Sequence, residues 1–339
     1  MRNANEILQA IRGGWNLGNS FDCFTAHLPG GETGWGNPVT TKAMIDEVAK
    51  KGFNIIRIPV TWFEHVNDED NYTIDPAFLA RVKEVVDWSI ENEMFVIVNT
   101  HHENSWTFPG VACYEKGAVK FTRIWEQVSE CFQDYPDLLL FEAMNEPRLE
   151  YGENEWGGAT KEVRDVINQY QEQFVKVVRS SGGNNADRCL LVTTAGAAIT
   201  EEAIGGLVIP KDHNIMVSLH LYLPHEFVDY NEGDRSVDVW DGSMNWVLDE
   251  SCDRINRMLV SKGYPVLMTE FGASDKYNNE AEVMKWADYF LDATAKYGIK
   301  CIWWDNNYTN LRGDNFALIK RENLTWLKPD LADLLVKER

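Results

Sequence analysis

Two glutamates stand at the ends of apolar segments, where a carboxylate adds no stability. Glu146 follows the run LLLFEAMN (138–145) and precedes Pro147, while Glu270 follows VLMT and precedes an aromatic residue. Proline biases the residue before it toward extended backbone, which holds Glu146 at the tip of a strand. A pair of acids facing one bond is suited to glycoside hydrolysis, because one protonates the leaving oxygen while the other attacks carbon or activates water.

Other residues that a hydrophobic core would reject also end strand-like segments. For a single residue, local bonding to the backbone is a sufficient explanation. Six strand ends with such residues indicate instead one shared site at the carboxyl end of a sheet. Besides the two glutamates, the residues are Arg57, His101, Asn145, His220 with Tyr222, and Trp303 with Trp304.

Apolar runs of strand length alternate with longer segments of helical period, which is typical of repeated βα units. Eight nearly continuous hydrophobic strands predict a parallel sheet closed into a (β/α)8 TIM barrel, in one domain that covers residues 1–339. The predicted strands are 13–18, 54–60, 94–100, 138–145, 188–195, 214–222, 265–272 and 300–306.

Helical periodicity fills the intervals between these strands. Glycines at 52, 263 and 298 follow periodic segments, where a left-handed residue commonly ends a helix. Residues 20–39 have the longest stretch of loop chemistry and are expected on the catalytic rim. The named helical segments are 40–52, 75–93, 161–180, 246–262 and 280–297.

The composition restricts the partners. The net charge of −21 repels nucleic acid and anionic lipid, so neither is expected as a partner. Thirteen tryptophans exceed what a core requires, so some are expected on a binding surface. The opening MRNANEILQAIRGG is not a signal peptide, and no apolar run has the length of a membrane span.

The cysteines are dispersed, with no C-x-x-C pair that would suggest zinc or a redox centre. A chain of this size does not need disulfide staples, so buried free thiols are expected. The six are Cys23, Cys113, Cys131, Cys189, Cys252 and Cys301.

The segments FEAMNEP, LHLY and LMTEFG, on successive polar strand ends in this order, resemble glycoside hydrolase family five, also called cellulase family A. The resemblance runs from GGWNLGNSFDC to CIWWDNN. GWNLGN followed by ETGWGNP (32–38) is similar to subfamily four, which is rich in endoglucanases and xyloglucanases.

The resemblance implies an endo-acting, retaining β-1,4-glucanase with Glu146 as acid/base and Glu270 as nucleophile. It implies further that Asn145 bonds the sugar 2-hydroxyl and that Arg57 and Tyr222 hold the nucleophile. The remaining implied contacts are His101 and His220 around the cleaved sugar, Trp303 as the floor of that subsite, and His102, which either contacts substrate or faces a loop.

Two physical expectations accompany this assignment. Double displacement requires carboxyl groups roughly 5 to 5.5 Å apart, a gap that sequence cannot measure. Glu146 must be protonated when substrate binds, so burial and the charge of Glu270 are expected to raise its pKa.

Several loop residues are candidates for contact with sugar, since aromatic rings stack on pyranose faces; the alternative is packing at the rim. The acids Glu103, Glu142 and Asp305 are expected to bond neighbouring residues. The loop candidates are Asn19, Trp35, Trp106, His27, Trp62, Trp156 and Trp240.

Two rival functions remain open. A zinc hydrolase would use His101, His102, His220 and Asp305, but neighbouring histidines on a strand should diverge, and H-x-H and H-E-x-x-H spacings are absent. A barrel that only binds carbohydrate is the other rival, and the presence of both acids disfavours it. We therefore expect no metal and no cofactor.

The expected partner is a β-glucan polysaccharide, and the sequence leaves cellulose, xyloglucan, mixed-linkage glucan, xylan and mannan open because preference resides in loops. The protein is expected to be a monomer secreted by a bacterium, with the signal peptide absent from this chain. A carbohydrate-binding or dockerin module in the parent protein is compatible with this expectation.

Overall fold

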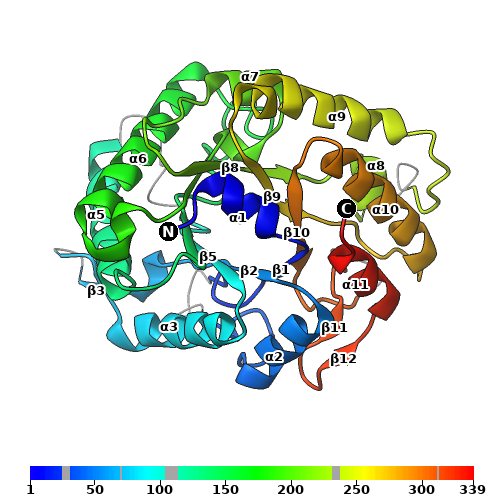
Figure 1. The fold of residues 1–339 in the computed structure, drawn as a ribbon, viewed down its shortest axis with the longest axis horizontal. Helices are drawn as coiled ribbons and strands as arrows, with labels where there is room; N and C mark the ends of the chain where they lie inside the picture. The colour runs from blue at the N-terminus through cyan, green and yellow to red at the C-terminus, as the bar shows by residue number, and fades with distance from the viewer. Residues whose placement is uncertain (25–30, 69–70, 104–113, 231–236, 311–312) are drawn as a thin grey trace.

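The computed structural model of the chain describes residues 1–24, 31–68, 71–103, 114–230, 237–310 and 313–339. Eight parallel strands close into a barrel in the order β1-β10-β9-β8-β7-β6-β5-β2, and helices alternate with them around its outside (Figure 1). The predicted (β/α)8 barrel is confirmed. Its strands are β1 (Gly14–Leu17), β2 (Ile55–Ile58), β5 (Phe95–Asn99), β6 (Leu139–Glu142), β7 (Leu190–Thr193), β8 (Ile215–Leu221), β9 (Val266–Phe271) and β10 (Lys300–Asp305).

The strands are buried on both faces, which explains their nearly continuous hydrophobic sequence. All seven residues of β8 and all six of β9 are buried. Neighbouring residues in a strand point to opposite faces, so one set fills the barrel and the other packs on helices. Each of the eight barrel strands lies within one of the eight predicted runs.

The helices have the start and stop signals that the sequence suggests. The Thr41 hydroxyl accepts the N–H of Met44 at the start of α2, and Gly52, with φ 116°, ends that helix. The five predicted helical segments correspond to α2, α3, α6, α9 and α10. The outer helices are α2 (Lys42–Lys51), α3 (Pro76–Glu91), α5 (Tyr114–Cys131), α6 (Lys161–Ser180), α7 (Glu201–Gly206), α8 (His225–Val228), α9 (Asn245–Met258), α10 (Glu280–Ala295) and α11 (Pro329–Val336).

Several short elements lie outside the barrel sheet. Two antiparallel ribbons pair β3 with β4 and β11 with β12. Their bounds are β3 (Val66–Asp68), β4 (Thr73–Ile74), β11 (Ile319–Lys320) and β12 (Thr325–Trp326), and 3-10 turns occur at Phe63–His65, Gly183–Ala186, Ala195–Ala197 and Val260–Lys262.

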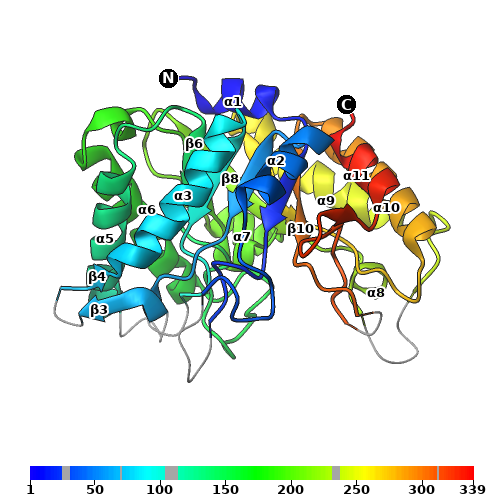
Figure 2. The same cartoon turned by 90° about the horizontal axis from the view of Figure 1, so that it is seen from below.

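The first helix, α1 (Ala4–Ala10), covers the amino-terminal end of the barrel (Figures 1 and 2). Ile7 and Ile11 are fully buried and join the cluster formed by inward residues of the strands, such as Ile55 and Leu191. Asn3 begins the helix with a capping box, because its side chain accepts the Glu6 N–H while Glu6 accepts its own. This helix is not among the segments predicted from the sequence.

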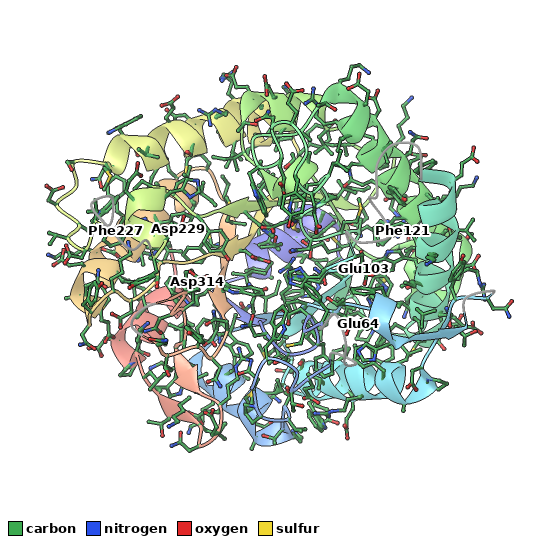
Figure 3. The ribbon with its side chains drawn as sticks, turned by 180° about the vertical axis from the view of Figure 1, so that it is seen from behind. Glu64, Glu103, Phe121, Phe227, Asp229 and Asp314 are labelled. Atoms are coloured by element: carbon green, nitrogen blue, oxygen red, sulfur yellow. The ribbon has the colours of Figure 1, made fainter. Side chains whose placement is uncertain are left out.

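The opposite end of the barrel carries the long βα loops, and Figure 3 looks onto this face. In Figure 2 it lies at the edge where β3, β4 and α8 are seen, away from α1 and from both chain termini. Active sites of TIM barrels lie at this carboxyl end.

Two further expectations concern membranes and thiols. None of the helices in the described parts of the chain has the length and apolarity that crossing a bilayer requires. Cys23, Cys131, Cys189, Cys252 and Cys301 are free thiols, and all except the half-buried Cys131 are buried. Cys113 lies outside the described residues.

The role of α1 gives a stability prediction. Ile7→Ala should lower the free energy of unfolding by about 2–5 kcal/mol, because it leaves a cavity in the apolar end of the barrel. Gln9→Ala, on the exposed face of the same helix, is the control and should change it by about 0.5 kcal/mol or less. Urea unfolding followed by tryptophan fluorescence measures both, and equal midpoints would mean that α1 is not part of the cooperative barrel.

Candidate active site

A guanidinium in the barrel interior organises the site. Arg57 is fully buried, and its Nε donates to Glu142 Oε2 at 2.7 Å. Its Nη1 donates to Glu270 Oε1 at 2.7 Å and to Asn16 Oδ1 at 3.0 Å, and its Nη2 donates to Asn145 Oδ1 at 2.8 Å. Burial opposes the charge, but the two carboxylates raise the pKa of Arg57 above its ordinary value. The residue is therefore a permanent cation, and four of its five N–H groups donate to the bonds described here.

Glu142, on β6, forms a buried ion pair with Arg57. Besides Arg57, its carboxylate accepts the side-chain N–H of Asn99 at 2.9 Å and the hydroxyl of Ser218 at 2.5 Å. The residue has no exposed surface. It bonds neighbouring residues, as the sequence analysis expected.

Glu270, at the carboxyl end of β9, is held by two donors. Arg57 occupies Oε1, and the Tyr222 hydroxyl donates to Oε2 at 3.0 Å. Burial and the charge of Glu270 raise the pKa of Tyr222 well above its ordinary value, so the phenol keeps its proton. A carboxylate fixed at both oxygens has little freedom to rotate.

Glu146 lies beyond the end of β6 and faces Glu270 across His220. The imidazole Nδ1 is 2.8 Å from Glu146 Oε1 and 3.6 Å from Glu270 Oε2. A carboxyl oxygen of Glu146 and one of Glu270 lie within 4.8 Å of each other. The two acids that the sequence singled out thus meet at one point.

The protonation of this trio differs from the expectation for Glu146. Burial raises the pKa of Glu146, but the bond and charge of His220, with Arg148 and His102 nearby, bring it below the usual glutamate value. Burial raises the pKa of Glu270. Burial opposes a charged His220, yet the two carboxylates raise its pKa above the usual histidine value. In the ligand-free protein these directions favour a proton on His220 over one on Glu146, and the expected rise in the pKa of Glu146 is wrong for this state.

His101 and His102 lie together at the end of β5. The His101 ring stacks on Trp304 at 5.8 Å between centroids and 6° between planes, and His102 meets it edge-on at 4.4 Å. The expectation that the two histidines diverge is wrong, because β5 ends at Asn99 and strand alternation no longer applies. Burial lowers the pKa of His102 to about 4 and lowers that of His101 well below its ordinary value.

The tryptophan pair on β10 corrects another expectation. Trp303 is paired with Trp15 and is fully buried among the rings of Phe271 and Trp286, so it cannot form the floor of a subsite. Trp304 is paired with Asn16, and the side chain of Asn16 points into the barrel. Trp304 is only partly buried. Strand alternation gives the inward position to Trp304.

The other loop candidates divide between rim and core. Trp35 is 41% exposed and packs beside His102, and Trp156 is 55% exposed and covers the guanidinium of Arg148 at 4.0 Å. Asn19 has a left-handed backbone, and its N–H bonds to Asp22. Trp62 and Trp240 are buried and pack on Phe78 and Phe227, so they lie in the core rather than on the rim. His27 and Trp106 lie outside the described residues.

The two remaining acids are structural, as expected. Glu103 is buried, accepts the backbone N–H of Trp62, and has a pKa raised by burial to about 8. Asp305 accepts the backbone N–H of Leu318 at 2.8 Å and pairs with Arg321 at 3.0 Å. In Figure 3, Glu103 lies beside Glu64, on the side of the barrel opposite Asp229 and Asp314.

The zinc set named from the sequence does not assemble within the described residues. The side chains that lie close enough to share an ion are Asp22 with His101 and His102, and the trio Glu146, His220 and Glu270. Both oxygens of Asp22 already accept backbone N–H groups, from Asn19 at 3.0 Å and Ser20 at 2.7 Å. Each oxygen of Glu270 likewise accepts a hydrogen bond, so an ion at either group would compete with hydrogen bonds that are already formed.

A layer of polar side chains beneath the acids was missed. Asn16, Asn99, Ser218 and Thr269 are buried inside the strands and bond to the Arg57–Glu142 pair or to each other. The signal was present, since each interrupts an otherwise apolar strand with an amide or a hydroxyl. Such residues are stable there only because they satisfy one another.

Comparison with known proteins shows similarity to glycoside hydrolases. Residues 18–310 match the family model described as "Cellulase (glycosyl hydrolase family 5)". Endoglucanase A of Clostridium longisporum is 41% identical over 345 residues, a match that covers 99% of this chain and 66% of that protein.

Two solved structures superpose closely on the barrel. The GH5-4 broad specificity endoglucanase from Clostridium acetobutylicum has a TM-score of 0.94 and 39% identity, covering 99% of this chain and 100% of that one. XEG5A, a xyloglucan-specific endo-beta-1,4-glucanase from a metagenomic library solved with cellotriose, has a TM-score of 0.94 and 40% identity, covering 98% of each chain.

Fold, site and relatives together define a glycoside hydrolase. The carboxyl pair stands where barrel enzymes place their reacting groups. More narrowly, the chain belongs to glycosyl hydrolase family 5, which confirms the resemblance read from FEAMNEP, LHLY and LMTEFG.

The bond from Tyr222 to Glu270 gives a prediction that needs no substrate. Tyr222→Phe should raise the pKa of Glu270, because a donor to the charged carboxylate is lost. Carbon-13 NMR titration of the glutamate carboxyl carbons measures the shift. Tyr289→Phe removes a similar bond to Asp249 on the surface and should leave Glu270 unchanged. An unchanged pKa in Tyr222→Phe would mean that the phenol does not stabilise the anion.

Proposed function

We propose that the protein is an endo-acting, retaining β-1,4-glucanase that cleaves cellulose-type β-glucans, with xyloglucan, mixed-linkage glucan and xylan as further substrates. The observation that carries the proposal is the short gap between Glu146 and Glu270, whose carboxyl oxygens lie within 4.8 Å. Retaining glycosidases hold their carboxyl groups about 5–5.5 Å apart, whereas inverting enzymes need roughly 6.5–9.5 Å for a water.

In the first step Glu270 attacks the anomeric carbon and the bond to the leaving oxygen breaks. Arg57 and Tyr222 keep the attacking carboxylate oriented. The leaving oxygen takes a proton from Glu146, so the departing chain leaves as a neutral alcohol. The product of this step is a glycosyl ester on Glu270.

The position of the shared proton indicates how Glu146 becomes an acid. In the free protein the raised pKa of His220 and the lowered pKa of Glu146 favour the proton on His220, whose Nδ1 is 2.8 Å from Glu146 Oε1. A bound sugar excludes water from the buried trio, which favours neutral groups over an ion pair. The proton then passes along the existing hydrogen bond to the carboxylate.

The second step uses the same residues in reverse. Esterification removes the negative charge of Glu270, and Glu146 is again a carboxylate after its proton has left. It takes a proton from a water molecule, whose oxygen attacks the anomeric carbon and releases Glu270. Two inversions give net retention.

The orientation of Asn145 supports its proposed bond to the sugar. Arg57 donates to its Oδ1, which leaves the Nδ2 hydrogens to donate elsewhere. A donor beside the reacting carbon suits the 2-hydroxyl, whose bond strengthens in the transition state.

The choice of substrate follows from relatives and from the rim. One solved relative is described as a broad specificity endoglucanase and another as xyloglucan-specific. Trp35 and Trp156 expose indole rings that suit stacking on pyranose faces along a chain. Mannan is the less favoured alternative.

A polymeric glucan does not cross membranes, so we propose that the protein acts outside the cell. We further propose that it is a monomer and that residues 1–339 form a single catalytic domain. The chain spans 66% of the length of the C. longisporum relative. A parent protein with a carbohydrate-binding or dockerin module is compatible with this difference in length.

The main test is reducing-end release from soluble cellulose derivatives, mixed-linkage glucan, xyloglucan, xylan and mannan. Glu270→Gln should lose several orders of magnitude in kcat on every polymer that the wild type cuts, since the nucleophile is gone. Glu172→Gln, on the exposed face of α6, should match the wild type. A folded Glu270→Gln with wild-type turnover, or release of single sugars only, would contradict the proposal.

The role of Glu146 is tested with leaving groups. Glu146→Gln should lower kcat/KM on polymers by about 10²–10⁴-fold, the range of general acid catalysis. Formation of the glycosyl intermediate from an aryl β-cellobioside with an acidic phenol should be nearly unaffected, because such a phenol needs no proton. Equal losses on both substrates would assign Glu146 another role.

Retention is tested by the configuration of the first product. Proton NMR of the reaction with cellotetraose should show the β anomer at the new reducing end before mutarotation. An initial α anomer would mean inversion and would exclude Glu270 as the nucleophile.

A further inference from the structure

We infer that Asn99 is a positioning residue that fixes His101 as a neutral imidazole with its proton on Nε2, so that His101 can only donate at that nitrogen. The tautomer is an inference from the described hydrogen bonds, whereas its effect on catalysis rests on the proposed function.

The orientation of the Asn99 amide is determined by two neighbours. Its Oδ1 accepts the backbone N–H of Val60 at 3.0 Å, and its Nδ2 is 2.9 Å from Glu142 Oε2. A backbone N–H can only donate, and a carboxylate paired with Arg57 can only accept. A flipped amide would place oxygen against carboxylate and N–H against N–H. Only one orientation is therefore compatible with both contacts.

This orientation decides the state of His101. The Nδ2 of Asn99 is also 3.2 Å from His101 Nδ1. Because the amide nitrogen is the donor, Nδ1 must be the acceptor and carries no hydrogen. A neutral imidazole then has its proton on Nε2, which has no hydrogen-bond partner among the described residues.

The surroundings oppose a second proton. His101 is 4% exposed. The charged or titratable groups around it include Arg57, Arg148, His102, His220, the carboxylate of Asp22 and, on the other side of the Asn99 amide, the carboxylate of Glu142. An imidazolium would also turn Nδ1–H toward the N–H of Asn99, with two donors facing each other. Burial is the main reason that the pKa of His101 lies well below its ordinary value, and the neighbouring histidines and arginines lower it further, which agrees with the neutral form.

The ring has little freedom to change this arrangement. It stacks on Trp304 with 6° between planes, and His102 packs against it edge-on. An N–H held in this position is a preorganised donor for a hydroxyl or ring oxygen of a sugar in the site. It also disfavours metal binding, since neither nitrogen of this tautomer offers an unoccupied lone pair.

Asn99 has a second connection to the reaction. The same amide nitrogen that bonds His101 also bonds Glu142, which holds Arg57, which in turn holds Glu270. One amide therefore links the donor His101 to the support of the carboxylate.

The first experiment determines the tautomer directly. Long-range proton–nitrogen correlation NMR of protein labelled with ¹⁵N in histidine should show His101 as the Nε2–H tautomer at neutral pH, with His101→Gln identifying its signals. An Nδ1–H tautomer or an imidazolium at His101 would overturn the inference. This measurement does not depend on any activity.

The second experiment tests the role of Asn99. Asn99→Asp replaces the donor by an acceptor and should move the His101 proton to Nδ1, and kcat/KM on the preferred glucan should fall about tenfold or more, since a lost hydrogen bond of about 1.4 kcal/mol is a factor of ten. Asn99→Leu removes the donor without adding an acceptor, so the tautomer of His101 should no longer be fixed. This variant replaces Asn99→Asp in the experiment if Asn99→Asp does not fold.

The matched control is Asn185→Asp, since Asn185 is equally buried but bonds Ser129 and Arg188 away from the site. It should retain kcat/KM within about twofold and leave the His101 signals unchanged. Turnover that is unaltered in Asn99→Asp despite a shifted tautomer would overturn the positioning role. A wild type that cleaves no β-glucan would refute the proposed function, while the tautomer measurement would still decide this inference.

Discussion

The buried guanidinium of Arg57 is the constraint on which the site depends. A cation without access to water is stable only when charged and polar partners surround it. The barrel supplies these partners from β1, from β6 and the segment after it, and from β9, as Asn16, Glu142, Asn145 and Glu270. The positions of Glu270 and Asn145 are thus fixed by the requirement to pair a charge. The contacts that neutralise the charge of Arg57 are therefore the same contacts that position Glu270 and Asn145 for catalysis.

The barrel divides its interior between two purposes. Near α1 the inward side chains are apolar and form one cluster with Ile7 and Ile11. Toward the other end they become amides, hydroxyls and charges. The apolar end supplies burial, and the polar end holds groups that burial alone would destabilise. A rigid apolar end helps to keep the polar end in register, because both belong to the same eight strands.

The sequence was sufficient for the barrel and the two acids because both depend on local patterns. Continuous apolar runs identify strands, and Glu146 and Glu270 interrupt such runs at their ends. It was insufficient for Trp303 and Trp304, since which of two neighbours points inward depends on the register with β1. The pairing of Trp303 with Trp15 and of Trp304 with Asn16 resolves that choice.

The remaining errors arise from contacts between distant segments. His101 and His102 lie beyond the end of β5, where alternation gives no guidance. The lowered pKa of Glu146 results from His220, which is 74 residues away in the chain. Helix α1 is short, and its apolar residues are buried only because they pack on the ends of strands that are distant in the sequence. None of these contacts has a local signature.

The position of both termini beside α1 has a practical consequence. In Figure 2 the N- and C-terminal ends of the chain lie at the end of the barrel remote from the acids. An attachment at either end, whether a surface, a resin or a second folded unit, would therefore leave the mouth of the barrel facing outward. Long, stiff molecules could approach the mouth without steric conflict with the support, which makes this barrel well arranged for immobilised or tethered use.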